Sequence, residues 1–509
     1  MAAEKIKLLR ELMGREGYAA VIIGSEDAHI SEYVSSRDER RSWLTEFSGS
    51  AGTAVVTVAE ALLWTDGRYF VQAEMQLSSD WTLMKSGEQG VPTMEEWISG
   101  KSGLPALSKV GVDPFLLSMN RQAALEAKLS GAGLELAFMT ANLVDEIWSD
   151  QPAAPCAPVM AYPVERAGRS TADKLSDVRA SLGESGAKAM VVTALDDVCW
   201  LFNIRGADVS YNPVVIAYGI IFPDSVKLLV DEAKLGDEVK QHLAGSGVEV
   251  CPYSSILDEV SALVASLEGD SVLCDPQYCN AAIAARIPKK QRVEKRSPIQ
   301  EFKGVKNPVE LEGMRQAHIR DGVALTSFLA WLEKTIADGG HVTEVTAADK
   351  LEELRSQQAH YVSLSFSTIA GYAANGAIIH YRAETDTAAT LGADSIFLLD
   401  SGAQYLDGTT DVTRTVHMGT PTDYEKECYT LVLKGHIGLA TAVFPEGVTG
   451  TRLDTLARLP LWQAGLDYRH GTGHGVGAFL NVHEGPQGIG YRIQANEAGM
   501  KLGMITSNE

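Results

Sequence analysis

The same order of helix and strand occurs twice in the first half of the chain, and this repetition sets the strongest limit on the fold. Residues 5–24, KIKLLRELMGREGYAAVIIG, predict a helix, a glycine break and an apolar strand. Residues 174–193, KLSDVRASLGESGAKAMVVT, repeat that order with the same glycine spacing. An acidic turn follows each copy, at residues 25–27 and 195–197. We expect two related α/β domains; a chance recurrence of helix and strand is the alternative.

Local signals divide the chain further. Residues 151–158, QPAAPCAP, form a Pro-rich linker between the two repeats. Asn307 is followed by Pro308 and Glu310, which together predict an N-cap, a proline in the first turn and an acid that favours the helix start. An amphipathic helix should follow to about residue 336. We expect an α/β (α+β) chain with domains over residues 1–160, 161–300 and 301–509.

Composition narrows the class of protein. No apolar run reaches the roughly 18 residues of a membrane helix, and the charged N-terminus does not resemble a signal peptide. The net charge of −22 argues against nucleic acid or an anionic membrane as a partner. The 6 cysteines are scattered without a CxxC pair, which indicates reduced thiols. We therefore expect a soluble protein of the cytoplasm.

The chemically most informative stretch is Ile396–Val416, IFLLDSGAQYLDGTTDVTRTV. Asp400 ends a short apolar strand, and a turn signal separates it from residues 409–416, which are rich in β-forming residues. Strand alternation would place Asp411 on one face with hydroxyl side chains only. The two carboxylates would then lie on neighbouring strands, where a metal ion could sit between them. A hairpin with a solvent-facing Asp411 is the alternative.

Histidines gather downstream, in residues 468–484, YRHGTGHGVGAFLNVHE. His470, His474 and His483, from a total of 11 histidines, fall there among glycines that allow close backbone approach. A single histidine is more often structural, but this cluster and the upstream carboxylates favour a metal site. Carboxylates with one imidazole suit Mn²⁺, with Co²⁺ or Zn²⁺ also possible, and the lack of thiolates argues against structural zinc.

In these and several other stretches, the chain resembles the pita-bread metallopeptidases, in particular the aminopeptidase P (Xaa-Pro aminopeptidase) family. The resembling text covers nearly the whole chain. It comprises GSAGTAVVT, LLWTDGRYFVQA, NGAIIHY, DSGAQYLDGTTDVTRTVHMGTP, YEKECYTLVLKGHIGLA and DYRHGTGHGVGAFLNVHEGP.

The resemblance implies a site with two divalent metals held by two Asp, one His and two Glu. Asp400 and Asp411 match the two Asp, His474 matches the His, and Glu509 in GMITSNE matches the first Glu. The second Glu has no counterpart within these 509 residues. We therefore expect a C-terminally incomplete catalytic domain that binds one metal weakly and has little peptidase activity.

The resemblance also implies a reaction, in which a hydroxide activated by the two metals hydrolyses the first bond of peptides with proline at the second position. Glu509 would relay a proton, His470 would support the metal ligands, and a homodimer would form. The residues implied to contact substrate are Arg68, His380, His474, His483 and Glu509.

Two other functions remain open at this point. A prolidase or a methionine aminopeptidase would have the same catalytic fold, but the doubled N-terminal α/β array disfavours both. A catalytically inactive relative that binds peptides or proteins is the other possibility. That class loses the metal ligands, whereas Asp400, Asp411, His474 and Glu509 are all retained here.

Overall fold

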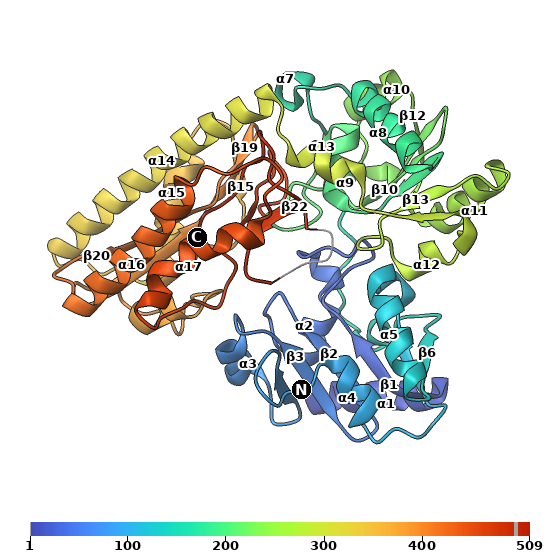
Figure 1. Ribbon diagram of the computed structural model, residues 1–509. Helices are drawn as coiled ribbons and strands as arrows, with labels where there is room; N and C mark the ends of the chain where they lie inside the picture. Colours follow the sequence, from blue (N-terminus) through green and yellow to red (C-terminus); the bar gives the residue numbers. More distant parts are fainter. Residues whose placement is uncertain (1, 493–496) are drawn as a thin grey trace. The chain divides into compact units, whose positions relative to one another are not determined.

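The computed structural model of the protein describes residues 2–492 and 497–509 (Figure 1). The chain divides into two compact units. The first unit consists of Met1–Ala161, Thr171–Ser210 and Val214–Pro298, and the second of Tyr162–Ser170, Tyr211–Pro213 and Ile299–Glu509. The second unit therefore takes two short segments from the middle of the sequence.

The first unit contains two six-stranded sheets with the same topology. Their strand orders are β4-β3-β2-β1-β5-β6 and β12-β11-β10-β8-β13-β14. In each, the first strand of the repeat pairs antiparallel on one side and parallel on the other, so β1 lies between β2 and β5 as β8 lies between β10 and β13. The two related α/β folds predicted from the sequence repeat are confirmed.

The strands of the first sheet are β1 (Tyr18–Ile23), β2 (Thr53–Thr57), β3 (Ala61–Thr65), β4 (Thr82–Lys85), β5 (Lys109–Val112) and β6 (Glu135–Phe138), with helices α1 (Ala2–Glu16), α2 (Arg40–Thr45), α3 (Phe70–Gln76), α4 (Met94–Gly100), α5 (Met119–Gly131) and α6 (Leu143–Ile147). Those of the second are β8 (Ala189–Val192), β10 (Ala217–Ile221), β11 (Val226–Val230), β12 (Val248–Pro252), β13 (Val272–Cys274) and β14 (Arg292–Glu294), with α8 (Thr171–Ser185), α9 (Leu195–Phe202), α10 (Asp237–Gly245), α11 (Ile256–Ser266) and α12 (Ala281–Ala284). The short strands β7 (Met160–Ala161) and β9 (Ile204–Arg205) pair with each other.

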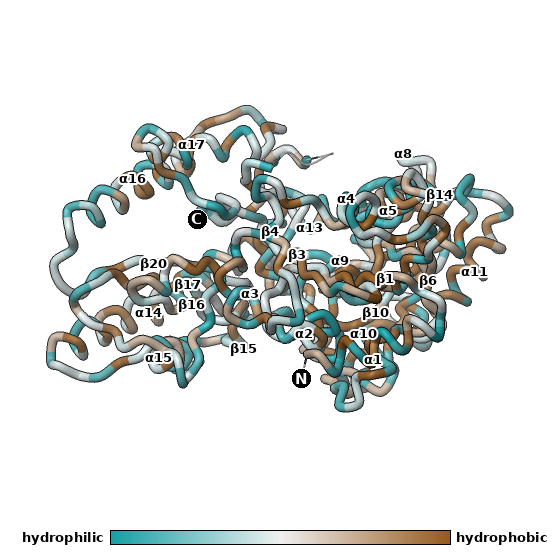
Figure 2. The backbone as a smooth tube through the Cα atoms, turned by 90° about the horizontal axis from the view of Figure 1, so that it is seen from below, coloured by the Kyte–Doolittle hydropathy of each residue, from teal (hydrophilic) through white to brown (hydrophobic). Residues whose placement is uncertain are grey.

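The repeat is also visible in how α1 and α8 pack. Helix α1 buries Ile6, Leu9 and Met13, and α8 buries three apolar residues at the same spacing, Leu175, Val178 and Leu182. Steps of three and four residues place such side chains on one face of a helix. Strand β1, which contacts α1, and strand β10 of the second sheet are apolar, as the brown segments at their labels in Figure 2 show. Burial of one helix face therefore forms each α/β layer.

The main segment of the second unit, Ile299–Glu509, starts within α13 (Pro298–Gly304) and continues with the long helix α14 (Pro308–Ala337). Asn307 caps α14 by accepting from the backbone N–H groups of Val309 and Glu310, and the Glu310 side chain accepts in return from the N–H of Asn307. This capping box satisfies N–H groups that have no partner within the helix. The predicted start of the helix is confirmed.

The remaining elements of this unit are short strands between helices. The sheets are β15-β18-β19, β16-β17-β20 and β21-β22. Their bounds are β15 (Tyr361–Leu364), β16 (Ile369–Tyr372), β17 (Ile396–Ser401), β18 (Ala403–Tyr405), β19 (Gly408–Thr409), β20 (Val412–His417), β21 (Gly473–Gly475) and β22 (Glu484–Ile489), with helices α7 (Val164–Ala167), α15 (Glu344–Ser356), α16 (Asp423–Ala440) and α17 (Gly450–Gln463).

The strand predicted over residues 409–416 is interrupted, so that prediction was wrong in detail. Strand β19 pairs with β18, whereas β20 pairs with β17 in another sheet. Thr410 is fixed at the crossing, because its N–H donates to Ala403 O at 2.9 Å and its carbonyl accepts from the Ser365 hydroxyl at 2.8 Å. Asp411 therefore lies in a connection between two sheets rather than within a continuous strand.

His380 lies in a turn, although the β-branched Ile378 and Ile379 just before it favour a strand. The buried carboxylate of Glu344 explains why. It accepts from the backbone N–H groups of Tyr372 at 2.7 Å and Ala389 at 2.8 Å, from the Asn375 amide, and from the Tyr381 hydroxyl at 2.8 Å. These contacts hold residues 372–389 in a compact loop, so tertiary contacts override the local β preference of Ile378 and Ile379.

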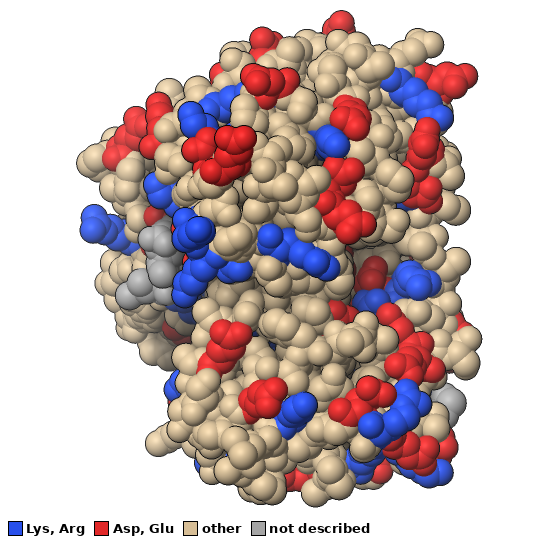
Figure 3. All heavy atoms as spheres, turned by 90° about the vertical axis from the view of Figure 1, so that its right-hand side faces the viewer, with Lys and Arg blue, Asp and Glu red and all other residues tan. Residues whose placement is uncertain are grey.

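The acidic excess of the sequence lies on the surface. Figure 3 shows Asp and Glu side chains spread over one whole face of the molecule among Lys and Arg. Among the described residues, the helices are too short or too polar to cross a lipid bilayer. All 6 cysteines are free thiols, as the scattered spacing predicted.

Candidate metal centre

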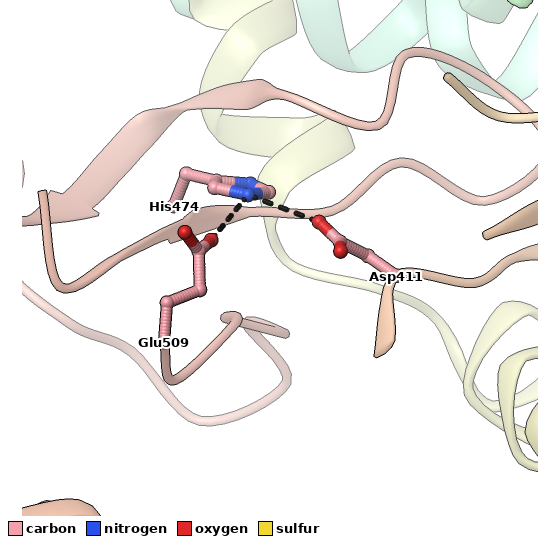
Figure 4. A group of neighbouring side chains, drawn as sticks. All are labelled: Asp411, His474 and Glu509. Carbon is pink, nitrogen blue, oxygen red and sulfur yellow. Dashed lines mark ion pairs between the residues drawn. The ribbon is translucent and has the colours of Figure 1, made fainter. Parts of the chain in front are cut away.

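Three side chains from distant parts of the sequence meet in the second unit (Figure 4). Asp411 precedes β20, His474 lies on β21, and Glu509 lies in the segment beside β21. His474 Nε2 is 3.2 Å from Asp411 Oδ2 and 2.9 Å from Glu509 Oε1. One donor atom of each residue lies within 4.8 Å of the other two. The three side chains are therefore arranged to share a single cation.

Backbone pairing sets this arrangement. The N–H of Ser507 donates to His474 O at 2.8 Å, and the N–H of Glu509 donates to Thr472 O at 2.8 Å. The glycines beside His474 make the approach possible, since a Cβ on Gly473 would lie 2.2 Å from the Ser507 carbonyl oxygen. The close backbone approach predicted from the glycine-rich sequence is confirmed, and the neighbour is the segment that carries Glu509.

The hydrogen bond at Nδ1 of His474 fixes the proton there and so determines the state of Nε2. Its Nδ1 is 2.8 Å from Gly475 O, and because a carbonyl only accepts, Nδ1 carries a proton. Nε2 therefore faces two carboxylates, where a bare lone pair would be repelled. Burial acts to lower the pKa of His474, but the hydrogen bonds with Asp411 and Glu509 hold that pKa well above its usual value. A positive charge at Nε2, on a proton or on a metal cation, would satisfy the two carboxylates.

Glu509 responds to the same charge. Burial acts to raise its pKa, but the hydrogen bond and charge of His474 and the hydrogen bond from Ser507 lower the pKa of Glu509 to about 2. The carboxylate is thus ionised at neutral pH. An ionised carboxylate is an oxygen ligand that divalent cations accept readily.

Asp400 adds a third carboxylate from β17, where Thr413 is its partner across the sheet. Burial, and then the charges of Asp411 and Glu509, raise the pKa of Asp400 to about 7. Its Oδ1 is buried and, among the described residues, has no hydrogen-bond partner. A buried carboxylate oxygen without a partner is costly, and a cation would satisfy it. The residues present therefore fit a second metal position between Asp400 and Asp411.

The other histidines of the sequence cluster are placed differently. The ring of His483 lies edge-on to that of His474, with centroids 4.3 Å apart. His470 instead contacts Gly471 O through Nδ1 at 2.8 Å and packs against the ring of Tyr468 at 4.6 Å. The structure brings His483 to the cluster, and it places His470 in the loop that leads to β21.

Two predicted substrate contacts, Arg68 and His380, belong to different units. Arg68 belongs to the first unit, where its guanidinium binds both oxygens of Asp66 at 2.9 Å. His380 belongs to the second unit and is half-buried in the turn that Glu344 organises. Their roles as substrate contacts remain predictions.

Arg458 on α17 supports the loop before His474. Its guanidinium donates to Asp454 Oδ2 at 2.8 Å, to Tyr468 O at 2.6 Å and to His470 O at 2.7 Å. Its side chain is almost completely buried. A buried guanidinium with a paired carboxylate and two carbonyl acceptors fixes the loop that carries the chain into β21.

Sequence reasoning missed Ser507, and it placed Thr413 on the face of Asp411 rather than opposite Asp400. Ser507 donates to Glu509 Oε1 at 2.8 Å, and Thr413 lies opposite Asp400. Each follows or precedes a candidate ligand by two residues, as in Asp411-x-Thr413 and Ser507-x-Glu509. In extended backbone such residues share a face. A hydroxyl two residues from a carboxylate is the signal that could have identified them.

Comparisons with known proteins place this geometry in context. Residues 5–146 and 150–310 match models of the creatinase/prolidase N-terminal domain, and residues 312–509 match metallopeptidase family M24. An Arabidopsis thaliana protein called aminopeptidase P1 is 43% identical over 552 residues, covering 100% of this chain and 85% of that protein. A probable Xaa-Pro aminopeptidase P from Paracoccidioides brasiliensis is 46% identical, covering 100% of this chain and 84% of its own length.

A solved structure agrees with this relationship. The X-prolyl aminopeptidase of Caenorhabditis elegans, described as a cytosolic enzyme with a di-nuclear active site, has a TM-score of 0.96 and 41% sequence identity. The match covers 99% of this chain and 84% of that one. Together with the family models, it confirms the predicted fold class.

Proposed function

Because the chain belongs to the Xaa-Pro aminopeptidase P family of M24 metallopeptidases, we propose that it uses the Asp411–His474–Glu509 cluster to remove the first residue from peptides with proline at the second position. The observation that carries the proposal is His474 Nε2, which faces two carboxylates and so requires a cation.

The donor set supports two divalent metal ions. Asp411, His474 and Glu509 would hold one of them, and Asp400 with Asp411 would hold the other, as the buried, unpaired Oδ1 of Asp400 favours. Oxygen-rich donors with one imidazole fit Mn²⁺ best and also accept Co²⁺ or Zn²⁺. When bound, such ions polarise a carbonyl and activate water.

The side chains around the cluster would have separate roles in catalysis and substrate binding. Glu509 is ionised at neutral pH and is placed to accept a proton and pass it on. His483, edge-on to His474, is placed to donate a hydrogen bond to the substrate carbonyl oxygen as negative charge develops there. We assign His380 and Arg68 to substrate contact, and His470 to support of the loop that carries His474.

Preference for proline needs a dedicated pocket, since the proline nitrogen lacks an N–H and restricts the residue before it. The proline assignment rests on the aminopeptidase P relatives. Hydrolysis of Arg-Pro-Pro and Leu-Ala-Ala by Mn²⁺-loaded protein tests it. We expect release of arginine from the first peptide only, and equal rates on both would overturn the assignment.

A second pair of substrates separates this activity from that of a prolidase. A prolidase acts on the dipeptide Xaa-Pro, whereas the proposed enzyme should prefer the longer Xaa-Pro-Yaa. Arg-Pro and Arg-Pro-Pro, compared at equal concentration, provide the measurement. Cleavage confined to the dipeptide would favour a prolidase.

We also propose a cytoplasmic homodimer. Helix α16 exposes an apolar row at intervals of four residues, with Tyr429 54%, Leu433 43% and Ile437 49% accessible, and association would remove such a surface from water. The cytosolic description of the C. elegans enzyme supports the compartment. Light scattering at micromolar concentration should give twice the mass of the chain, and a monomer there would contradict the dimer.

A further inference from the structure

The hydroxyl of Ser507 connects two residues of the cluster. Its oxygen accepts from the backbone N–H of His474 at 3.0 Å, and its proton is donated to Glu509 Oε1 at 2.8 Å. The direction of both bonds is fixed, because an N–H only donates and a hydroxyl has one proton. The oxygen that Ser507 binds is the same Glu509 oxygen that lies 2.9 Å from His474 Nε2.

The backbone places Ser507 where its hydroxyl reaches both residues. Ser507 and Glu509 are two residues apart in an extended segment, so their side chains share a face. The segment is in register with β21 through the bonds from Ser507 N–H to His474 O and from Glu509 N–H to Thr472 O, both 2.8 Å. The bridge thus spans two backbone segments that are already paired.

Without that hydroxyl, Glu509 would have little to fix its carboxylate. Its side chain is 34% accessible, and the last torsion of a glutamate side chain has broad preferences. Among the described residues, the remaining polar contact of the Glu509 carboxylate is with His474. A carboxylate that rotates into water must be reordered before it can bind a cation, which weakens binding.

We propose that Ser507 is a positioning residue that holds the Glu509 carboxylate toward the cation site of Asp411 and His474. This inference rests on the proposed function, since it assumes that the cluster binds a divalent metal. Hydrogen-bond partners of metal ligands typically change metal affinity by about 10- to 100-fold when they are removed. Ser507 would act through Glu509, without touching substrate.

The test is calorimetric titration of metal-stripped protein with Mn²⁺. Ser507→Ala should bind Mn²⁺ about 10-fold more weakly than the unmodified protein. Ser507→Thr and Ser507→Val form a matched pair of nearly equal shape, of which only threonine keeps the hydroxyl. Threonine should restore the affinity and valine should not. Thr506→Ala is the control, because Thr506 pairs with Gly475 through backbone and its side chain has no hydrogen bond among the described residues.

Activity provides a second measurement. At limiting Mn²⁺ the Ser507→Ala protein should lose kcat while KM for Arg-Pro-Pro stays unchanged, and excess Mn²⁺ should restore kcat. Unchanged Mn²⁺ affinity in Ser507→Ala, or equal affinities of the threonine and valine variants, would overturn the role of the hydroxyl while leaving the proposed function intact. Failure of the unmodified protein to bind Mn²⁺ would overturn both.

Discussion

His29 in the first unit and His474 in the second have similar hydrogen bonds on one side of the ring and opposite surroundings on the other. Nδ1 of each lies 2.8 Å from a backbone carbonyl, Thr193 O for His29 and Gly475 O for His474. Nε2 of His29 lies 2.9 Å from the Tyr253 hydroxyl, whereas Nε2 of His474 faces Asp411 and Glu509.

The difference separates a structural histidine from a candidate metal ligand. With Nδ1 protonated, neutral His29 accepts from Tyr253 and needs nothing more. Burial lowers the pKa of His29, although Asp27 acts in the opposite direction, so the neutral form is favoured. The partners of His474 instead require positive charge. The groups that contact Nε2, rather than burial or the presence of histidine itself, therefore distinguish the candidate cation site from a structural histidine.

The largest expected effect comes from removing a carboxylate beside His474. Asp411→Ala should lower kcat/KM for Arg-Pro-Pro by on the order of 10³-fold, because metal-assisted charge stabilisation is worth several kcal/mol. Circular dichroism should show an unchanged fold, since Asp411 lies outside the paired strands. Asp423→Ala, at a fully exposed carboxylate, is the control and should keep full activity. Turnover retained by Asp411→Ala would contradict the metal site.

The corresponding change in the first unit should affect stability instead. His29→Leu leaves the Thr193 carbonyl and the Tyr253 hydroxyl without the ring partners they have now. Buried groups that lose their partner cost about 1–3 kcal/mol each, so urea denaturation should show a loss of roughly 2–4 kcal/mol.

Mn²⁺ affinity should not change in that variant. The exposed residue His341 provides the control, and His341→Leu should lie within about 0.5 kcal/mol of the unmodified protein. If His29→Leu weakened Mn²⁺ binding as strongly as a change at the cluster, the distinction between the two histidines would fail.

Metal binding should stabilise the folded protein, and this effect should depend on the cluster of His474 and not on His29. At 100 times its dissociation constant, Mn²⁺ should raise the unfolding free energy by about 2.7 kcal/mol, because it binds the folded state only. Thermal denaturation with and without Mn²⁺ measures this gain. The gain should persist in His29→Leu and disappear in Asp411→Ala. Equal stabilisation of both variants would place the metal elsewhere.

The smallest effect is the pH dependence of the metal-free protein, and it has opposite signs for the two histidines. The pKa of His29 is lowered on folding, so its contribution is lost as pH falls below the unfolded value near 6.5. The pKa of His474 is raised, so its contribution is complete below that value and is lost as pH rises through the folded pKa.

Urea denaturation between pH 5 and pH 9, compared with that of His29→Leu and His474→Gln, separates the two. The difference between the unmodified protein and His29→Leu should shrink toward acid. The difference from His474→Gln should shrink toward alkali. If both stability differences changed with pH in the same direction, the charge states assigned to the two rings would be wrong.

The parts of the fold that could be predicted from the sequence depend on neighbouring residues. The faces of α1 and α8 follow from apolar spacing, and the start of α14 follows from Asn307 and Glu310. The cluster was predicted by resemblance, and Asp411, His474 and Glu509 do lie together. These features need only local periodicity, a cap or a motif.

The features that were missed depend on contacts between distant residues. Thr410 ends one hairpin because Ala403 and Ser365 bind it, and local β preference predicted a continuous strand instead. The turn of His380 depends on Glu344, which lies 36 positions earlier in the numbering. Ser507 contacts His474 only because its segment pairs with β21. The spacing of residues along the sequence does not show which distant residues will contact each other in the fold.

Glu344 has a further consequence for motion. The two oxygens of this one carboxylate accept hydrogen bonds from the N–H groups of Tyr372 and Ala389, from the Asn375 amide and from the Tyr381 hydroxyl. The bonds at the two ends of this loop therefore break together when that carboxylate leaves its place. The loop should behave as one cooperative opening unit, in which the amides of Tyr372 and Ala389 exchange with solvent at a common rate, and His380 is released or retained with them.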